Sequence, residues 1–309
     1  MKMSIRGHKM KIVVGTRGSN LALTQTNMVI QMIKDKCPDI EFEVKIIKTK
    51  GDIIKDVAID KIGGKEIFVK EIERELLEGT IDMAVHSMKD MPGKLPKGLK
   101  LSSTPAREDH RDVLVCREGI RSLDELPKGA RIGTGSKRRK YQILKYRPDL
   151  DIVPIRGNVE TRIKRIEEEN LDGVILAAAG IKRLGLNLGS RILYLDRDII
   201  LPSPTQGILA IEIREQDKRM DSILAHISHK ETEIQAVVER AFLTGVGGSC
   251  TVPVGAYCQV LEDKILLEGL LGSEDGDILI RRSITEDIKA YEKAGYKLAE
   301  MLMKEMERI

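Results

Sequence analysis

The chain has 309 residues, of which 41% are hydrophobic and 3% aromatic, with no tryptophan. Its 52 basic residues nearly balance its 48 acidic ones, which leaves a formal net charge of +4. The length predicts two or three domains. The balanced charge and scarce aromatic rings argue against the basic and stacking surfaces by which proteins bind nucleic acid.

Four cysteines and five histidines are scattered without metal-ligand spacing, so we expect no metal site. No apolar run reaches the length of a membrane-spanning helix, and the basic start of the chain lacks the apolar core of a signal peptide. We therefore expect a cytoplasmic protein with reduced thiols and no membrane contact.

The first part of the chain alternates apolar runs with amphipathic segments, the pattern of α/β proteins. We expect helices from Ser19 and over 66–79, where Gly79 suits a helix C-terminus, and strands at 11–16, 41–49 and 81–88. After a loop at 89–98, the charged cluster at 107–112 suggests a crossover between domains.

A second α/β unit follows, with helices from Ser136 and over 159–170 and strands at 130–135, 151–157 and 172–180. The proline- and glycine-rich segment 201–207 resembles a hinge. The remainder has an α+β pattern: a helix from about Lys230, strands at 251–260, 264–272 and 278–285, and a helix to Ile309.

Arginines gather where predicted strands lead into helices. Ser19, Ser136 and Asn158 are expected N-caps, and the basic residues around them are Arg17, Lys137, Arg138, Arg139, Arg156 and Arg162. Cations at a helix N-terminus cost about 0.3–1 kcal/mol, unless an anion binds there. Any one of these arginines alone suggests an ordinary surface residue. Three such junctions, with Arg183 after a further strand, favour a cleft that binds several carboxylates or phosphates.

Asp90 is the most specific acidic feature, because it follows a buried strand just before a turn at Pro92. It is either a turn residue, the commoner case, or a carboxylate held in the basic cleft, with Lys89 keeping it ionised. His86 is a candidate acid or base, although a partly buried structural histidine is the commoner case.

Cys250 lies in the loop "GGSC", whereas a structural cysteine is usually a buried apolar residue. No cysteine-protease signature surrounds it. The loop thiol is either simply tolerated or a point of covalent attachment.

Eight ordered blocks together resemble the porphobilinogen deaminase family: "GTRGSNLALTQT", "GGKEIFVKEIE", "DMAVHSMKDMP", "GTGSKRRKYQ", "RGNVETRI", "AAAGIKRLGL", "PTQGILAIE" and "GGSCTVPVGAY". The resemblance covers the chain from about Lys11 to the last helix. It implies an enzyme that joins four porphobilinogen molecules head to tail, releases ammonia at each step and gives hydroxymethylbilane.

The implied fold is α/β, with two periplasmic-binding-protein-like domains joined by a hinge and a small α+β domain with a three-stranded antiparallel sheet. The implied bounds are 1–106 with 208–226, then 111–201, then 230–309. The implied protein is a monomer whose only partner is its small-molecule substrate.

The resemblance also implies the site residues. A dipyrromethane cofactor is bound through a thioether to Cys250. Asp90 is the catalytic carboxylate, which helps ammonia leave and stabilises the azafulvenium cation that results. The residues expected to hold the carboxylates of cofactor and substrate are Arg17, Gln25, Lys61, Lys65, Ser87, Lys89, Ser136, Arg138, Arg139, Arg156, Arg162 and Arg183.

Three residues depart from the family pattern: Asn20 stands in place of proline, Lys137 in place of an apolar residue and Thr205 in place of glycine. Glu66, an acidic residue in a basic loop, has no explanation. A two-lobed binding protein for an organic polyanion is the rival reading. The missing secretion signal, Asp90 in a basic cleft and the Cys250 domain weigh against it.

Overall fold

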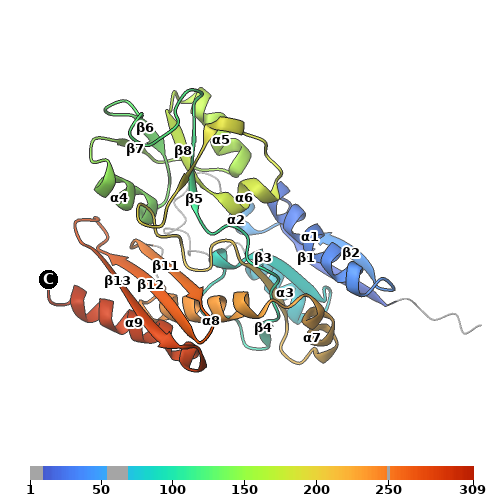
Figure 1. The fold of residues 1–309 in the computed structure, drawn as a ribbon. Helices are drawn as coiled ribbons and strands as arrows, with labels where there is room; N and C mark the ends of the chain where they lie inside the picture. The colour runs from blue at the N-terminus through green and yellow to red at the C-terminus, as the bar shows by residue number, and fades with distance from the viewer. Residues whose placement is uncertain (1–9, 54–68, 249–250) are drawn as a thin grey trace, which may run out of the picture.

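The computed structural model describes residues 10–53, 69–248 and 251–309, and their strands form three sheets (Figure 1). The first sheet has the strand order β2-β1-β3-β10-β4, the second β7-β6-β8-β5-β9 and the third β11-β12-β13. This confirms the expected fold class of two α/β units and a small three-stranded antiparallel one.

The first sheet consists of β1 (Lys11–Thr16), β2 (Glu41–Ile46), β3 (Met83–Ser87), β4 (Leu99–Leu101) and β10 (Leu209–Arg214). Its helices are α1 (Asn20–Lys36), α2 (Lys50–Ile53), α3 (Lys70–Leu77) and α7 (Lys218–Leu224). The second sheet consists of β5 (Asp112–Cys116), β6 (Arg131–Gly133), β7 (Asp151–Val153), β8 (Gly173–Ala177) and β9 (Ile192–Leu195). Its helices are α4 (Lys137–Tyr146), α5 (Val159–Glu168) and α6 (Ala178–Arg183).

The two sheets share one plan: three parallel strands, then an antiparallel strand, then a short edge strand. In the first sheet β10 is antiparallel to β3 and β4, and in the second β5 is antiparallel to β8 and β9. The chain therefore passes between the sheets twice, between β4 and β5 and between β9 and β10. Both passages agree with the crossover and hinge expected at 107–112 and 201–207.

The third sheet is formed by β11 (Val254–Val260), β12 (Lys264–Gly272) and β13 (Leu279–Asp287). Helices α8 (Lys230–Gly245) and α9 (Tyr291–Met306) pack against it around Phe242, Leu267 and Leu298, which are fully buried. The two helices approach closely at Gly295, which has no side chain. A Cβ atom there would lie 2.3 Å from the carbonyl oxygen of Val238.

Most helix starts agree with the sequence. The side chains of Ser19, Ser136 and Asn158 accept hydrogen bonds from backbone amides in the first turns of α1, α4 and α5. Several boundaries differ from those expected. Residues 178–180, expected to extend a strand, begin α6 because alanine strongly favours helix. The terminal helix ends at Met306 rather than Ile309.

Glu239 on α8 connects the third sheet to both passages between the other two. Its fully buried carboxylate accepts hydrogen bonds from Arg107 Nη1 (2.6 Å) and Nη2 (3.1 Å), from the Thr205 amide (2.5 Å) and from the Cys258 amide (2.8 Å). Thr205 has a φ of 61°, a left-handed conformation that favours glycine. Within the described ranges, no helix is both long and apolar enough to cross a bilayer.

Candidate functional site

Asp90 is held at the end of a short 3-10 turn that follows β3. Met88 and Met91 anchor this turn in the core, and the Met91 amide donates to the Met88 carbonyl. Asp90 itself is exposed. The alternation of buried methionines with polar residues therefore presents the carboxylate outward from a fixed base.

Three further predicted residues gather at the same strand end. Gln25, buried on α1, donates from Nε2 to Ser87 Oγ at 2.9 Å, and Lys89 Nζ donates to Gln206 Oε1 at 3.2 Å. Lys89 keeps part of its surface exposed, yet burial lowers the pKa of its ammonium group to about 8, against the opposing charge of Asp90.

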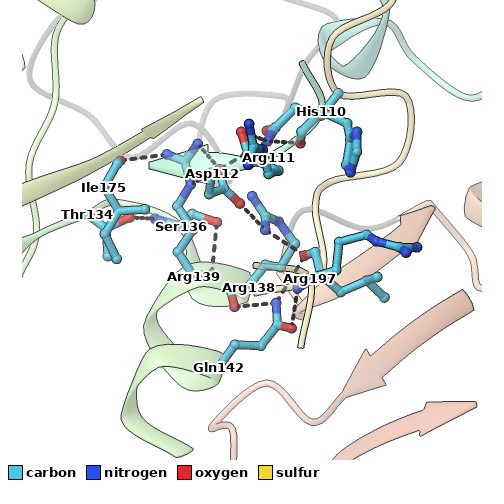
Figure 2. A network of polar contacts seen from close by, with 12 residues as sticks. His110, Arg111, Asp112, Thr134, Ser136, Arg138, Arg139, Gln142, Ile175 and Arg197 are labelled. Atoms are coloured by element: carbon cyan, nitrogen blue, oxygen red, sulfur yellow. Dashed lines mark hydrogen bonds and ion pairs between the residues drawn. The ribbon is translucent and has the colours of Figure 1, made fainter. Parts of the chain in front are cut away.

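Arg138 and Arg139, at the start of α4, converge on one buried carboxylate, Asp112 (Figure 2). Arg138 Nη1 lies 2.6 Å from Asp112 Oδ2, and Arg139 Nη2 lies 2.7 Å from Oδ1. Gln206 Nε2 also donates to Oδ1, at 3.1 Å. Burial alone would raise the pKa of Asp112, but the two arginine charges outweigh it and hold the pKa well below its usual range.

Asp112 was not among the residues expected from the sequence. It compensates only one of two guanidinium charges, so this cluster keeps a net positive charge close to Lys89, whose charge also acts on Asp112. Asp112 is part of the charged run at 107–112, which in the sequence indicates only a crossover between domains.

Arg162, on α5 of the second sheet, faces Asp90 of the first. Its Nε donates to the Gly157 carbonyl at 2.8 Å. Burial first and the charge of Arg139 second lower the pKa of Arg162 to about 10, and the charge of Asp90 opposes the shift. The charges of Asp90 and Arg162 therefore interact although the two residues belong to different sheets.

Arg183, at the end of α6, has one buried hydrogen-bond donor that is not used in the part of the chain that the structure describes. Its Nη2 donates to the Gly207 carbonyl at 2.6 Å, whereas its buried Nε has no hydrogen-bond partner among the described residues. Burial lowers its pKa to about 10. An unused guanidinium donor fits a group that binds a carboxylate.

The remaining predicted residues have simpler positions. Arg17 and Arg156 are half-buried, each just after the end of a strand, and Ser136 caps α4. Lys61, Lys65 and Cys250 lie outside the described residues, as does Glu66. Within the described ranges, no group of three His, Cys, Asp or Glu residues could hold a metal ion.

Comparison with known proteins assigns both parts of the chain to one family. Residues 12–222 match the model "Porphobilinogen deaminase, dipyromethane cofactor binding domain", and residues 234–304 match "Porphobilinogen deaminase, C-terminal domain".

Two relatives are similar over nearly their whole length. A porphobilinogen deaminase of Clostridium novyi (strain NT) is 61% identical over 299 residues, which cover 96% of this chain and 100% of the relative. One of Clostridioides difficile (strain 630) is 57% identical over 299 residues, covering 96% and 99%.

Solved structures give weaker matches. They include a Bordetella pertussis BvgS VFT2 domain (14% identity, 74% of this chain and 91% of that chain, TM-score 0.42). Another is the probable amino-acid transporter binding protein ytmK of Bacillus subtilis (11% identity, 77% and 97%, TM-score 0.42).

Proposed function

The chain belongs to the porphobilinogen deaminase family, and from that premise we propose that Asp90 is its catalytic carboxylate and Cys250 its point of cofactor attachment. The enzyme is a transferase that polymerises porphobilinogen to hydroxymethylbilane in tetrapyrrole biosynthesis. Its cofactor is a dipyrromethane. When bound, this cofactor supplies the pyrrole to which substrate is added.

The exposed Asp90 carboxylate at the strand end that also holds Gln25, Ser87 and Lys89 is the observation that carries the residue roles. Porphobilinogen is a pyrrole with an acetate and a propionate, and it becomes cationic as its amine leaves. A carboxylate among arginines suits both demands, because the arginines bind the side-chain carboxylates while Asp90 stabilises the cation. Charge that exists only along the reaction coordinate is the charge whose stabilisation raises the rate.

Asp90 is also proposed to accept a proton. Formation of the new carbon–carbon bond leaves a proton on the attacked pyrrole carbon, and the exposed Asp90 carboxylate can accept it. The cation from which ammonia has left is then neutral again, and the chain is longer by one ring.

The other expected residues are proposed to hold carboxylates. Arg183 is supported by its unused Nε, and Lys89 and Arg162 by a positive charge that interacts with Asp90. Arg138 and Arg139 are proposed to share their donors between Asp112 and a ligand. Arg17, Ser87, Ser136 and Arg156 are supported by their places at or near strand and helix ends, and Gln25 by its hydrogen bond to Ser87. Lys61 and Lys65 rest on the family pattern.

The test uses the enzyme with its cofactor. Intact mass should exceed the sequence mass by two pyrrole units, and Cys250→Ser should lack the excess. Asp90→Asn should keep the excess mass but form hydroxymethylbilane about 10²–10⁴-fold more slowly, as general acid–base loss typically does. A rate within a few-fold of wild type would make Asp90 a turn residue.

We also propose three domains, at 1–106 with 208–226, at 111–201 and at 230–309. The support is that each sheet draws its strands from one of these sets. A cytoplasmic monomer is likewise proposed. Cys37, Cys116 and Cys258 are free thiols, in keeping with a reducing compartment, and sedimentation at micromolar concentration tests the monomer.

A further inference from the structure

Glu212 is a buried carboxylate in β10, behind the turn that carries Asp90. It is fully buried, and neither of its oxygens accepts a hydrogen bond from any described residue. A buried carboxylate without hydrogen bonds is costly unless opposite charges lie close by. A histidine from β3 contacts it, and the charge of an arginine from α8 interacts with it.

The group from β3 is His86. Its Nε2 lies 3.2 Å from Glu212 Oε2, although the two atoms are not aligned for a hydrogen bond. His86 is buried and pairs with Ala210 across the sheet. The contact therefore fixes the end of β3 just before the Asp90 turn.

The group from α8 is Arg240. Burial lowers the pKa of Arg240, and the charge of Glu212 opposes that shift. Its Nη2 donates to the carbonyl oxygens of Pro92 (3.0 Å) and Gly93 (3.1 Å). These carbonyls come directly after the Asp90 turn, so Arg240 ties the far side of the turn to α8.

The turn that carries Asp90 is thus held by His86 on one side and by Arg240 on the other; we call His86, Glu212 and Arg240 the brace. The brace has no atom in the proposed substrate site. It joins β3 to α8, the helix that ends at Gly245, shortly before Cys250 in the chain.

We propose that Arg240 and Glu212 are positioning residues that fix the Asp90 carboxylate relative to α8, and so relative to the growing pyrrole chain. This inference rests on the proposed role of Asp90. Displacing a catalytic group by about 1 Å can cost about 10²-fold in rate. Substrate binding should change less than the rate, because most of the proposed carboxylate-binding residues lie on other elements and only Ser87 and Lys89 share the braced segment.

The decisive experiment is a double-mutant cycle on cofactor-loaded enzyme. Arg240→Gln should lower kcat roughly 10–100-fold with a smaller change in KM, Glu212→Gln should behave in the same way, and Arg240→Lys should recover part of the loss. In an Asp90→Asn background, Arg240→Gln should have almost no further effect, since the carboxylate that it positions is already gone. Arg282→Gln, which removes an exposed arginine paired with Glu305, is the matched control.

A second measurement is independent of turnover. Deuterium uptake by a peptide covering residues 86–95 should rise in Arg240→Gln and not in Arg282→Gln, while intact mass shows that both carry cofactor. Equal losses from Arg240→Gln with and without the Asp90 carboxylate, or unchanged exchange in this peptide, would overturn the proposal. A nearly normal Asp90→Asn enzyme would instead overturn the proposed role of Asp90. If Arg240→Gln does not fold, Arg240→Lys is put through the same cycle and judged by the same outcomes.

Discussion

Lys89 lies beside Asp90 with its ammonium group largely removed from water, which makes its charge depend on pH near neutrality. Its pKa of about 8 means that the cation is present below pH 8 and is lost as the pH rises through 8. A lysine that binds substrate carboxylates would lose that ability over the same range.

We therefore expect kcat/KM for porphobilinogen to fall as the pH rises through 8. In Lys89→Arg this fall should move to higher pH, because arginine stays charged throughout the range. The check is a pH–rate profile of both enzymes, with the exposed Lys94→Arg as control. Identical profiles for Lys89→Arg and wild type would mean that another group titrates.

Asp112 is the residue on which the two buried arginines depend. Asp112→Asn keeps the size of the side chain but leaves Arg138 and Arg139 buried without a counter-charge. Breaking such a cluster typically costs about 3–5 kcal/mol, so the urea midpoint should fall markedly. Asp151→Asn, at an exposed pair with Arg131, should leave the midpoint almost unchanged, and an equal shift in both variants would contradict the argument.

At the same scale, the sequence predicts the arginines and Asp90 but not what they touch. Arg138 and Arg139 stand out because cations beside Ser136 are locally unfavourable. Asp112 has no such mark: it is one acid in a charged run, and its contact with Arg138 spans 26 residues. The role of Glu212 is not predicted either, because the sequence of its strand does not indicate that this carboxylate is buried.

Among the elements, the antiparallel strands β5 and β10 were not expected, nor were the short edge strands β4 and β9. The parallel strands lie within α/β repeats, where alternation with helices identifies them. By contrast, β5 and β10 follow directly after the passages between sheets, and their partners are far away in the sequence. Their pairing is decided by tertiary contacts that local pattern does not contain.

Helix α8 supports both passages through Glu239, and this gives a prediction at the scale of the element. Glu239→Gln removes the counter-charge of Arg107, whose side chain is 7% exposed. The thermal midpoint should fall, and deuterium exchange should rise in the segments around Arg107 and Thr205 together. Glu300→Gln, an exposed residue of α9, serves as control; faster exchange in only one segment would show that the passages are not coupled through Glu239.

Across the whole molecule, two residues that depart from the expected family pattern contact distant parts of the chain. Lys137, at the start of α4, places Nζ 3.0 Å from Glu274 Oε1 beyond β12, and the Tyr141 hydroxyl donates to the Glu274 carbonyl at 3.1 Å. Asn20 on α1 donates to Glu160 on α5 at 2.8 Å. The departures at positions 20 and 137 therefore each add a contact between separate parts of the fold.

The contact between Lys137 and Glu274 should be weak. Glu274 is 70% exposed, so a double-mutant cycle of Lys137→Ala and Glu274→Ala should give a coupling of about 0.2–1 kcal/mol. The coupling should vanish in molar salt, and cofactor content should stay normal. Loss of cofactor in Lys137→Ala alone would instead place this lysine at the carboxylate site.

The burial of Cys116 and Cys258 has a practical consequence for following how the enzyme is assembled. Burial raises the pKa of Cys116 to about 12 and raises that of Cys258 as well, so neither forms the thiolate that alkylating reagents need. In the native protein the fold thus removes two of the four thiols from any titration. Once Cys250 is joined to the cofactor by a thioether, its sulfur does not react with thiol reagents either. Counting labels on native protein therefore measures how many molecules carry the cofactor and are ready for synthesis.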